Sequence, residues 1–341
     1  MAVQVQQQRA GGELANPLAA AKRAATRAER VSAGLDDLDR WLRDQIRSGL
    51  NGMDSAGYAH FDSMAARMVD AQAPGVASML RSIPAEMAGV QWPERVLSQL
   101  GSLHLLIQAH RRLDALPADL AATVRSRIGY PVSKSDVLAG PGISDRWFAL
   151  GMVDTVEFRL ETRRVWLFGT TTSRWALWLN FAPPGGQLDA SALPGQVLSA
   201  DLHFYSGSGQ YRALIGRRHD TGDDDSRQPA DQPPVETLSE VQRRYADIVA
   251  ADPWASRMPA VIEAAPIPSR EPGKSWQLRD SSGFACDLVG LVAEPWPLLA
   301  RSGGAPIRIF GEWNGRGLRA LSVLADDQGL PFSTSVVGRA G

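Results

Sequence analysis

The sequence predicts an α+β protein, in which an N-terminal all-α helical domain precedes one or two antiparallel β-rich units of an OB-like barrel type. Apolar residues recur at helical spacing as far as Tyr130, and beyond Pro131 they alternate in short runs separated by glycine, serine and proline. The chain has 341 residues, of which 44% are hydrophobic and 21% charged, so two or three domains with apolar cores are expected.

The N-terminal part of the chain predicts a series of helices. Residues 1–16 are polar and contain a glutamine run, which is typical of a disordered tail. An alanine-rich helix is expected from Pro17, followed by a second amphipathic run with Ile46 on its apolar side. A later helix places Leu97 on its apolar face. Residues 17–130 therefore form the predicted helical domain, whose further helical runs are 58–69, 76–83, 93–113 and 120–128.

The pattern after Pro131 predicts a first β-rich unit at residues 131–218. Alternating or β-rich runs predict strands at 156–160, 164–170, 174–181 and 197–205. The following residues, 219–234, are acidic and rich in proline, which is typical of a linker.

A second β-rich unit is expected at residues 235–330. It begins with a predicted helix over 235–251 and continues with a β-rich block over 274–324. Residues 331–341 are expected to be loosely ordered.

The two β-rich units share a weak repeat. Tyr211-Arg212-Ala213-Leu214 matches Leu318-Arg319-Ala320-Leu321, and each tetrapeptide follows a tryptophan, Trp166 or Trp276, at a similar distance. Between them lie the triplets Arg174-Trp175-Ala176 and Gly283-Phe284-Ala285. Two origins stay open: a duplication, or two antiparallel domains that both use turn glycines and inward-facing aromatic residues. A small OB-type barrel can bind nucleic acids, sugars or proteins, so this fold would leave the ligand undecided.

Composition and termini exclude several classes of protein. The net charge of −1 gives no overall attraction for nucleic acid, although a local basic patch stays open. The single cysteine, Cys286, excludes an intramolecular disulfide framework and fits a reducing compartment. No run approaches the roughly 20 apolar residues of a membrane-spanning helix, and the N-terminus lacks the apolar stretch of a secretory signal. A cytoplasmic protein without membrane contact is expected.

Several stretches after the first 16 residues carry a family pattern. They are Ala28-Glu29-Arg30-Val31, residues 34–44, residues 64–75, Asp145-Arg146-Trp147, residues 162–167 and residues 174–177. Together they resemble the C-terminal region of bacterial SWIM zinc-finger proteins, and the resemblance covers nearly all of the chain. It implies a role in binding protein or nucleic acid, and a protein partner such as a MoxR-type ATPase or a von Willebrand factor A protein.

The zinc finger of that family is missing from this chain. A SWIM finger uses three cysteines and a histidine in a C-x-C…C-x-H pattern, because tetrahedral zinc needs about four nitrogen or sulfur ligands. Cys286 is the only cysteine, so no metal ligand of the family is carried over and no cofactor is expected. The chain is then a divergent or truncated member, or half of a split protein whose finger lies on another polypeptide.

The sequence contains no recognisable catalytic motif. Its five histidines are widely spaced, and no H-E-x-x-H or paired C-x-x-C occurs. Cys286 has no basic neighbour in sequence that would stabilise a thiolate. Asp36 and Asp37 are interpreted as carboxylates that open a helix, where anions are favoured. We therefore expect a protein that is not an enzyme; a hydrolase would need a histidine–carboxylate pair in a deep pocket.

Basic side chains are the candidate binding residues. One cluster lies on predicted strands, where guanidinium groups can contact phosphates and aromatic rings can stack on bases: Arg163, Arg164, Trp166 and Arg174. Alternation places Arg164 and Trp166 on one face, and a core tryptophan with solvated arginines is the simpler interpretation. The other cluster lies on the first helix, as a nucleic-acid or partner surface or as an exposed solubilising face: Lys22, Arg23, Arg27 and Arg30.

The predicted function is non-catalytic macromolecular interaction, as a scaffold or adaptor with a protein partner. The alternative is a nucleic-acid-binding protein that uses the arginine and aromatic faces of its β-rich units. Its affinity for oligonucleotides would fall steeply with salt.

Overall fold

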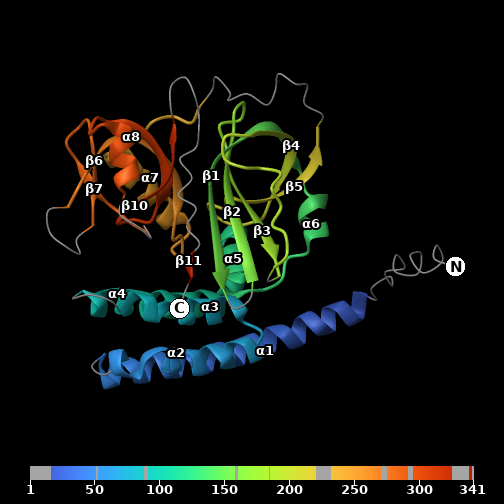
Figure 1. Cartoon of the computed structure of the whole chain (residues 1–341). Coiled ribbons are helices and arrows are strands. Elements are labelled where there is room, and N and C mark those ends of the chain that lie inside the picture. The colour runs from blue at the N-terminus through green and yellow to red at the C-terminus, as the bar shows by residue number, and fades with distance from the viewer. Residues whose placement is uncertain are drawn as a thin grey trace. The chain divides into compact units, whose positions relative to one another are not determined.

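The computed structural model describes residues 17–50, 53–87, 91–157, 160–183, 185–219, 232–269, 275–290, 295–324 and 338–339. The predicted tail at 1–16, most of the predicted linker and most of the predicted loose C-terminus lie outside these residues. Internal contacts divide the chain into two compact units, Met1–Pro131 and Val132–Gly341. The first is helical and the second is β-rich (Figure 1), so the predicted α+β class is confirmed.

The helical unit contains five α-helices and two short 3₁₀ helices within its described part. They are α1 (Pro17–Ser48), α2 (Met53–Asp70), α3 (Pro74–Ser82), η2 (Ile83–Met87), α4 (Trp92–Arg111), η3 (Leu113–Ala115) and α5 (Ala118–Ile128). Their buried faces meet in an apolar core that includes Leu35, Leu38, Phe61, Met64, Leu80, Leu103 and Val124. Prolines in the first turns of α3 and α4 suit helix starts, since the N–H groups of the first turn have no acceptor within the helix.

The first helix differs from the prediction of two separate runs. It is one continuous helix of 32 residues, because Gly34 at the join is used for packing rather than as a break. A Cβ atom on Gly34 would lie 2.3 Å from the Cβ of Ala71, so glycine lets α1 approach the end of α2 closely. The predicted inward positions of Ile46 and Leu97 were wrong, since both side chains are 51% exposed.

The first half of the β-rich unit is a small barrel preceded by a short helix, α6 (Lys134–Ala139). Its strands are β1 (Gly142–Glu157), β2 (Leu160–Gly169), β3 (Trp175–Ala182), β4 (Val197–Phe204) and β5 (Arg212–Arg218). Strand β1 pairs with β2 on one side and with β4 on the other, which closes the order β1-β2-β3-β5-β4 into a ring. The pairs are antiparallel except β3–β5. A two-residue strand, β11 (Gly338–Arg339), pairs with the end of β1.

The second half repeats this plan after helix α7 (Leu238–Ala251). The strands β6 (Met258–Ile267), β7 (Gln277–Asp280), β8 (Ala285–Leu288), β9 (Ile307–Trp313) and β10 (Gly317–Leu324) form a closed barrel, with helix α8 (Trp296–Ser302) between β8 and β9. The ring order is β6-β7-β8-β10-β9, and β8–β10 is again the parallel pair. Both barrels therefore follow the five-stranded OB-type order, in which the third strand pairs with the fifth.

The sequence repeat agrees with this shared strand order only in part. Ala213 and Ala320 both belong to their own barrel core, and each lies on the fifth strand of its ring. Trp276 also lies inside the second barrel, whereas Trp166 faces outward from the first. The two tryptophans therefore do not occupy equivalent positions, although the two barrels have the same order of strands.

The two barrels share an apolar cluster. It contains Phe148, Leu150, Val153, Trp166 and Phe168 from the first barrel and Val261, Phe310, Leu321 and Leu324 from the second. Trp175 stacks on Phe310 with ring centroids 5.5 Å apart. The part of the outward face of β2 and β3 that carries Trp166, Phe168, Trp175 and Leu177 is therefore covered by the second barrel, whereas Phe181 on β3 is 48% exposed. OB-type barrels commonly use this face for ligands.

No helix in the described part of the chain has the length and apolar character needed to span a lipid bilayer.

Candidate functional site

Two of the four candidate residues on the strands, Arg164 and Trp166, reach the same carboxylate. Trp166 Nε1 donates a hydrogen bond of 2.9 Å to Glu312 Oε1, and Arg164 Nη2 lies 3.4 Å from Glu312 Oε2. Arg257 approaches the same oxygen at 3.8 Å. Burial alone would raise the pKa of Glu312, but the charges of Arg164 and Arg257 and the Trp166 bond lower it, so the carboxylate stays ionised.

The other two strand candidates have different surroundings. Arg163 donates to both carboxylate oxygens of Asp154, at 2.9 and 2.7 Å, and to the carbonyl of Asp189 at 3.2 Å. Arg174 is exposed, and its guanidinium carbon lies 4.5 Å from the centroid of the Phe204 ring. Of these four residues, only Arg174 presents its side chain to solvent, because Arg163 and Arg164 are largely buried and Trp166 is buried.

The four candidate residues of α1, Lys22, Arg23, Arg27 and Arg30, come together in one groove of the helical unit, which we call the basic groove. Its volume is about 820 Å³. It is lined by Ala19, Lys22, Arg23, Ala24, Thr26, Arg27, Arg30, Gln72, Tyr130 and Pro131. The lining contains four cationic side chains and no carboxylate, so its charge is complementary to anionic groups.

Arg27 holds together the part of the basic groove that Gln72 and Tyr130 form, which we call its floor. Its Nη2 atom donates to the carbonyls of Gln72 and Gly129, at 3.1 and 3.2 Å, and its guanidinium lies 5.8 Å from the Tyr130 ring centroid. The Tyr130 hydroxyl is 3.2 Å from His110 Nε2. Burial raises the pKa of Tyr130, while the charges of Arg125 and Arg27 lower it less, so the hydroxyl stays neutral. These contacts fix the floor before any ligand arrives.

The other three cations of the basic groove are available to bind a ligand. Lys22, Arg23 and Arg30 are exposed, and none of them forms a hydrogen bond or ion pair with another described residue. Among the residues between Leu18 and Arg30 whose side chains are described, none is buried; the first buried residue of α1 is Val31. We call residues 17–30 the basic arm.

Gln72, Tyr130 and Pro131 were missed as groove residues by sequence reasoning. Gln72 contributes a backbone carbonyl, which it presents because its φ of 62° turns the chain between α2 and α3. Tyr130 and Pro131 follow the left-handed glycine that ends α5, Gly129 with φ 104°. No local motif marks these positions, since each acts through its place in the bundle.

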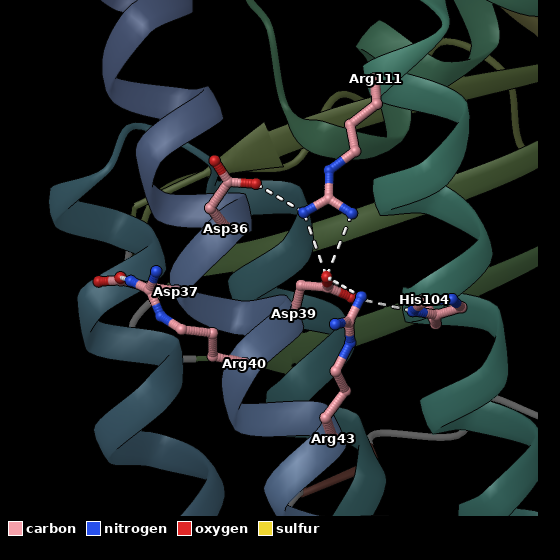
Figure 2. A network of polar contacts seen from close by, with 7 residues as sticks. All are labelled: Asp36, Asp37, Asp39, Arg40, Arg43, His104 and Arg111. Atoms are coloured by element: carbon pink, nitrogen blue, oxygen red, sulfur yellow. Dashed lines mark hydrogen bonds and ion pairs between the residues drawn. The ribbon is translucent and has the colours of Figure 1, made fainter.

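A second polar network joins α1 to α4 and is centred on Asp39 (Figure 2). The Asp39 side chain is 5% exposed. Its carboxylate accepts from Arg43 at 2.9 Å, from His104 Nδ1 at 3.0 Å and from two nitrogens of Arg111 at 3.1 Å each. Burial would raise the pKa of Asp39, but the Arg111 hydrogen bond and the charges of Arg111 and Arg43 bring it below its ordinary value.

The Asp39 network corrects the interpretation of the neighbouring carboxylates. Asp36 and Asp37 do not open a helix, because they lie in the middle of α1. Asp36 pairs with Arg111 at 2.6 Å, and Asp37 pairs with Arg40 and with Arg67. Every carboxylate of this network has a cationic partner, so the network fastens α1 to α2 and α4.

One histidine–carboxylate pair lies on the first barrel. His219 Nε2 is 2.8 Å from Asp201 Oδ1 and 3.3 Å from Ser144 Oγ. A nucleophile triad needs the serine and the carboxylate on opposite nitrogens of the ring, and here both share Nε2. Among the described residues there is no group of three or more histidine, cysteine or acidic side chains that could hold a metal ion. Burial raises the pKa of the Cys286 thiol to about 11, which suppresses the thiolate.

A comparison with protein-family models matched residues 26–128 to the SWIM-associated four-helix bundle domain. The resemblance to the C-terminal region of SWIM proteins is therefore confirmed over the helical unit. The match begins within α1, so Ala19, Lys22, Arg23 and Ala24 of the basic groove precede it. Searches of curated proteins and of solved structures gave no match.

Proposed function

We propose that this protein is a non-catalytic scaffold or adaptor, and that it holds a protein partner through acidic side chains of that partner in the basic groove. The observation that carries the proposal is the convergence of Lys22, Arg23, Arg27 and Arg30 on one groove whose lining has no carboxylate. Such a surface attracts anionic partners over about 10 Å at 0.1 M salt and orients them before contact.

The arrangement of the groove favours binding over catalysis. Its lining has no histidine, cysteine or carboxylate, and His110, whose ring nitrogen lies 3.2 Å from the Tyr130 hydroxyl, is not part of the lining. Arg27 is already engaged by two backbone carbonyls and positions the floor rather than a substrate.

The proposed partner is a protein, and the resemblance to SWIM proteins implies two classes for it. These are a MoxR-type ATPase and a von Willebrand factor A protein. Because the family match lies in the helical unit, we place partner binding in that unit and assign no binding role to the two barrels.

Nucleic-acid binding through the strands has less support. Arg163 and Arg164 are engaged by Asp154 and Glu312, and Trp166 is buried against the second barrel. A single-strand site needs exposed rings and free cations side by side. Of the strand candidates only Arg174 meets the second condition.

The proposal is tested with the full chain and labelled polyglutamate as the probe, by fluorescence anisotropy. We expect saturable binding that weakens as salt rises, and a loss of roughly tenfold in affinity in the double variant Arg23→Glu/Arg30→Glu. The matched control is Arg217→Glu, which reverses an exposed cation of β5 outside the groove and should leave the affinity unchanged. Absence of binding, or an equal loss in the control, would refute the proposal. Tighter binding of a single-stranded oligonucleotide would support the alternative function.

A further inference from the structure

The basic arm presents most of its side chains to solvent. Its described side chains are exposed or half-buried, and Leu18 at its start is 81% exposed. A solvent-exposed helix with alanines on its surface gains little from burial and is usually completed by a neighbouring element. The nine residues 17–25 of α1 also lie outside the family match.

Cations repeat along the basic arm at helical spacing. Lys22 and Arg30 are eight residues apart, and Arg23 and Arg27 are four residues apart. Residues three, four and seven or eight apart share one face of a helix, so the cations form a stripe about 12 Å long. A second helix with carboxylates at the same spacing could place one carboxylate opposite each cation of this stripe.

The lining of the basic groove also contains apolar surface. Ala19 and Ala24 from the arm and Tyr130 and Pro131 after the end of α5 contribute hydrocarbon surface beside the cations. An anionic chain with phosphates along its whole length would leave this surface uncovered. A helix with an apolar stripe bordered by carboxylates would cover it and meet the cations together.

We propose that the occupant of the basic groove is an acidic amphipathic helix of a protein partner, which lies alongside the basic arm. Its carboxylates face Lys22, Arg23 and Arg30, and its apolar stripe covers Ala24 and Tyr130. This inference rests on the proposed function and adds the conformation and side-chain pattern of the partner. The floor fixed by Arg27 lowers the entropic cost of binding, because Tyr130 does not have to be ordered by the ligand.

The test compares two labelled peptides of identical composition with the full chain. In the first, glutamates recur every three or four residues beside a stripe of leucine and alanine; in the second, the same residues are scrambled. We expect the first peptide to bind at least about tenfold more tightly than the second, because only its helix presents both stripes on one side. We also expect its circular dichroism to gain helical signal on binding.

A matched pair of variants isolates the apolar contact. Ala24 lines the basic groove and Ala25 does not, and both are exposed on the same helix. Ala24→Gln should weaken the amphipathic peptide several-fold while it leaves polyglutamate binding unchanged. Ala25→Gln should change neither. Circular dichroism of both variants checks that α1 remains folded.

The outcomes separate this inference from the proposed function. Equal affinity for the two peptides would show that charge alone determines binding to the groove. That result would overturn the proposal of an amphipathic helix and would leave the scaffold proposal intact. Failure of polyglutamate and of both peptides to bind would overturn both. An oligonucleotide of equal charge that binds more tightly than the amphipathic peptide would also overturn the inference.

Discussion

Trp166 and Glu312 join the two barrels through a hydrogen bond of 2.9 Å from the indole nitrogen to the carboxylate. The two residues lie on β2 and β9, and 146 positions separate them in the sequence. The same carboxylate draws in Arg164 and Arg257. A buried charge with these partners is stabilising only as a complete set, since each group left alone loses its solvation without compensation.

Glu312→Ala is therefore expected to destabilise the β-rich unit strongly. The substitution leaves Arg164 and the Trp166 N–H without their acceptor inside the barrel interface, and broken buried pairs of this kind cost about 3–5 kcal/mol. Urea unfolding followed by tryptophan fluorescence measures the change. Glu263→Gln, on an exposed position of β6, serves as the control and should alter the unfolding free energy by less than about 0.5 kcal/mol. Similar midpoints for the two variants would contradict the role given to Glu312.

Asp39→Asn should weaken the helical unit and flatten its acid dependence. The pKa of Asp39 is lowered in the folded protein, so its stabilising effect is complete above the unfolded pKa of about 3.9 and is lost as pH falls through the folded pKa. The variant lacks this ionisation. Hydrogen exchange of peptides from α1 and α4, measured between pH 5 and pH 3, should show a smaller loss of protection with acid in the variant.

The size of the Asp39 effect is checked against Asp44→Asn on the same helix. Asp44 is 67% exposed, and its ion pair with Arg47 contributes little. We expect a loss of about 2–4 kcal/mol for Asp39→Asn and less than about 0.5 kcal/mol for Asp44→Asn. If the Asp39→Asn variant had the same free energy of unfolding as the original protein at pH 7, the Asp39 network would not be needed for stability.

Two glycine-to-alanine substitutions should have opposite signs. Gly34→Ala introduces a methyl group 2.3 Å from the Cβ of Ala71, so α1 and α2 must separate at a cost of about 1–3 kcal/mol. Gly101→Ala lies in α4 with open space around the new methyl group, and removing a glycine from a helix interior should stabilise by about 0.5–1 kcal/mol. Thermal unfolding of the two variants measures both changes, and a shift of the same sign in both would contradict the assigned packing.

Cys286 should react slowly with thiol reagents in the native protein. Burial raises its pKa to about 11, so at pH 8 the thiolate fraction is small and the sulfur is shielded. Absorbance with Ellman's reagent should rise slowly in buffer and quickly to one equivalent in denaturant, because the chain has one cysteine. Rapid labelling of the native protein would show that the β8 strand opens easily.

Much of the fold could be predicted because the periodicity of the sequence is local. Two strands were not predicted. The segment that forms β1 contains glycines and polar residues, yet its pairing with both β2 and β4 makes it the longest strand. The segment of β6 contains Pro259 and Pro266, which usually discourage strand predictions, and it becomes a strand because β7 and β9 pair with it on both sides. Long-range pairing outweighed local preference in both cases.

The candidate site was only half visible in the sequence. Lys22, Arg23, Arg27 and Arg30 could be found because they share one helix. The basic groove also needs Gln72 and Tyr130, which are brought to Arg27 by the bundle. For the strand candidates, composition predicted arginines beside aromatic residues but could not indicate that a second barrel would cover Trp166.

The basic arm and the second half of α1, which packs Leu35 and Leu38 into the core, are one uninterrupted helix of 32 residues. An α-helix is stiff along its axis, because each turn is tied to the next by backbone hydrogen bonds. A pull on a partner seated at the arm would therefore reach Leu35 and Leu38 in the bundle core directly, with no hinge to absorb it. A partner bound at the basic arm would therefore be attached rigidly to the helical bundle rather than through a flexible tether.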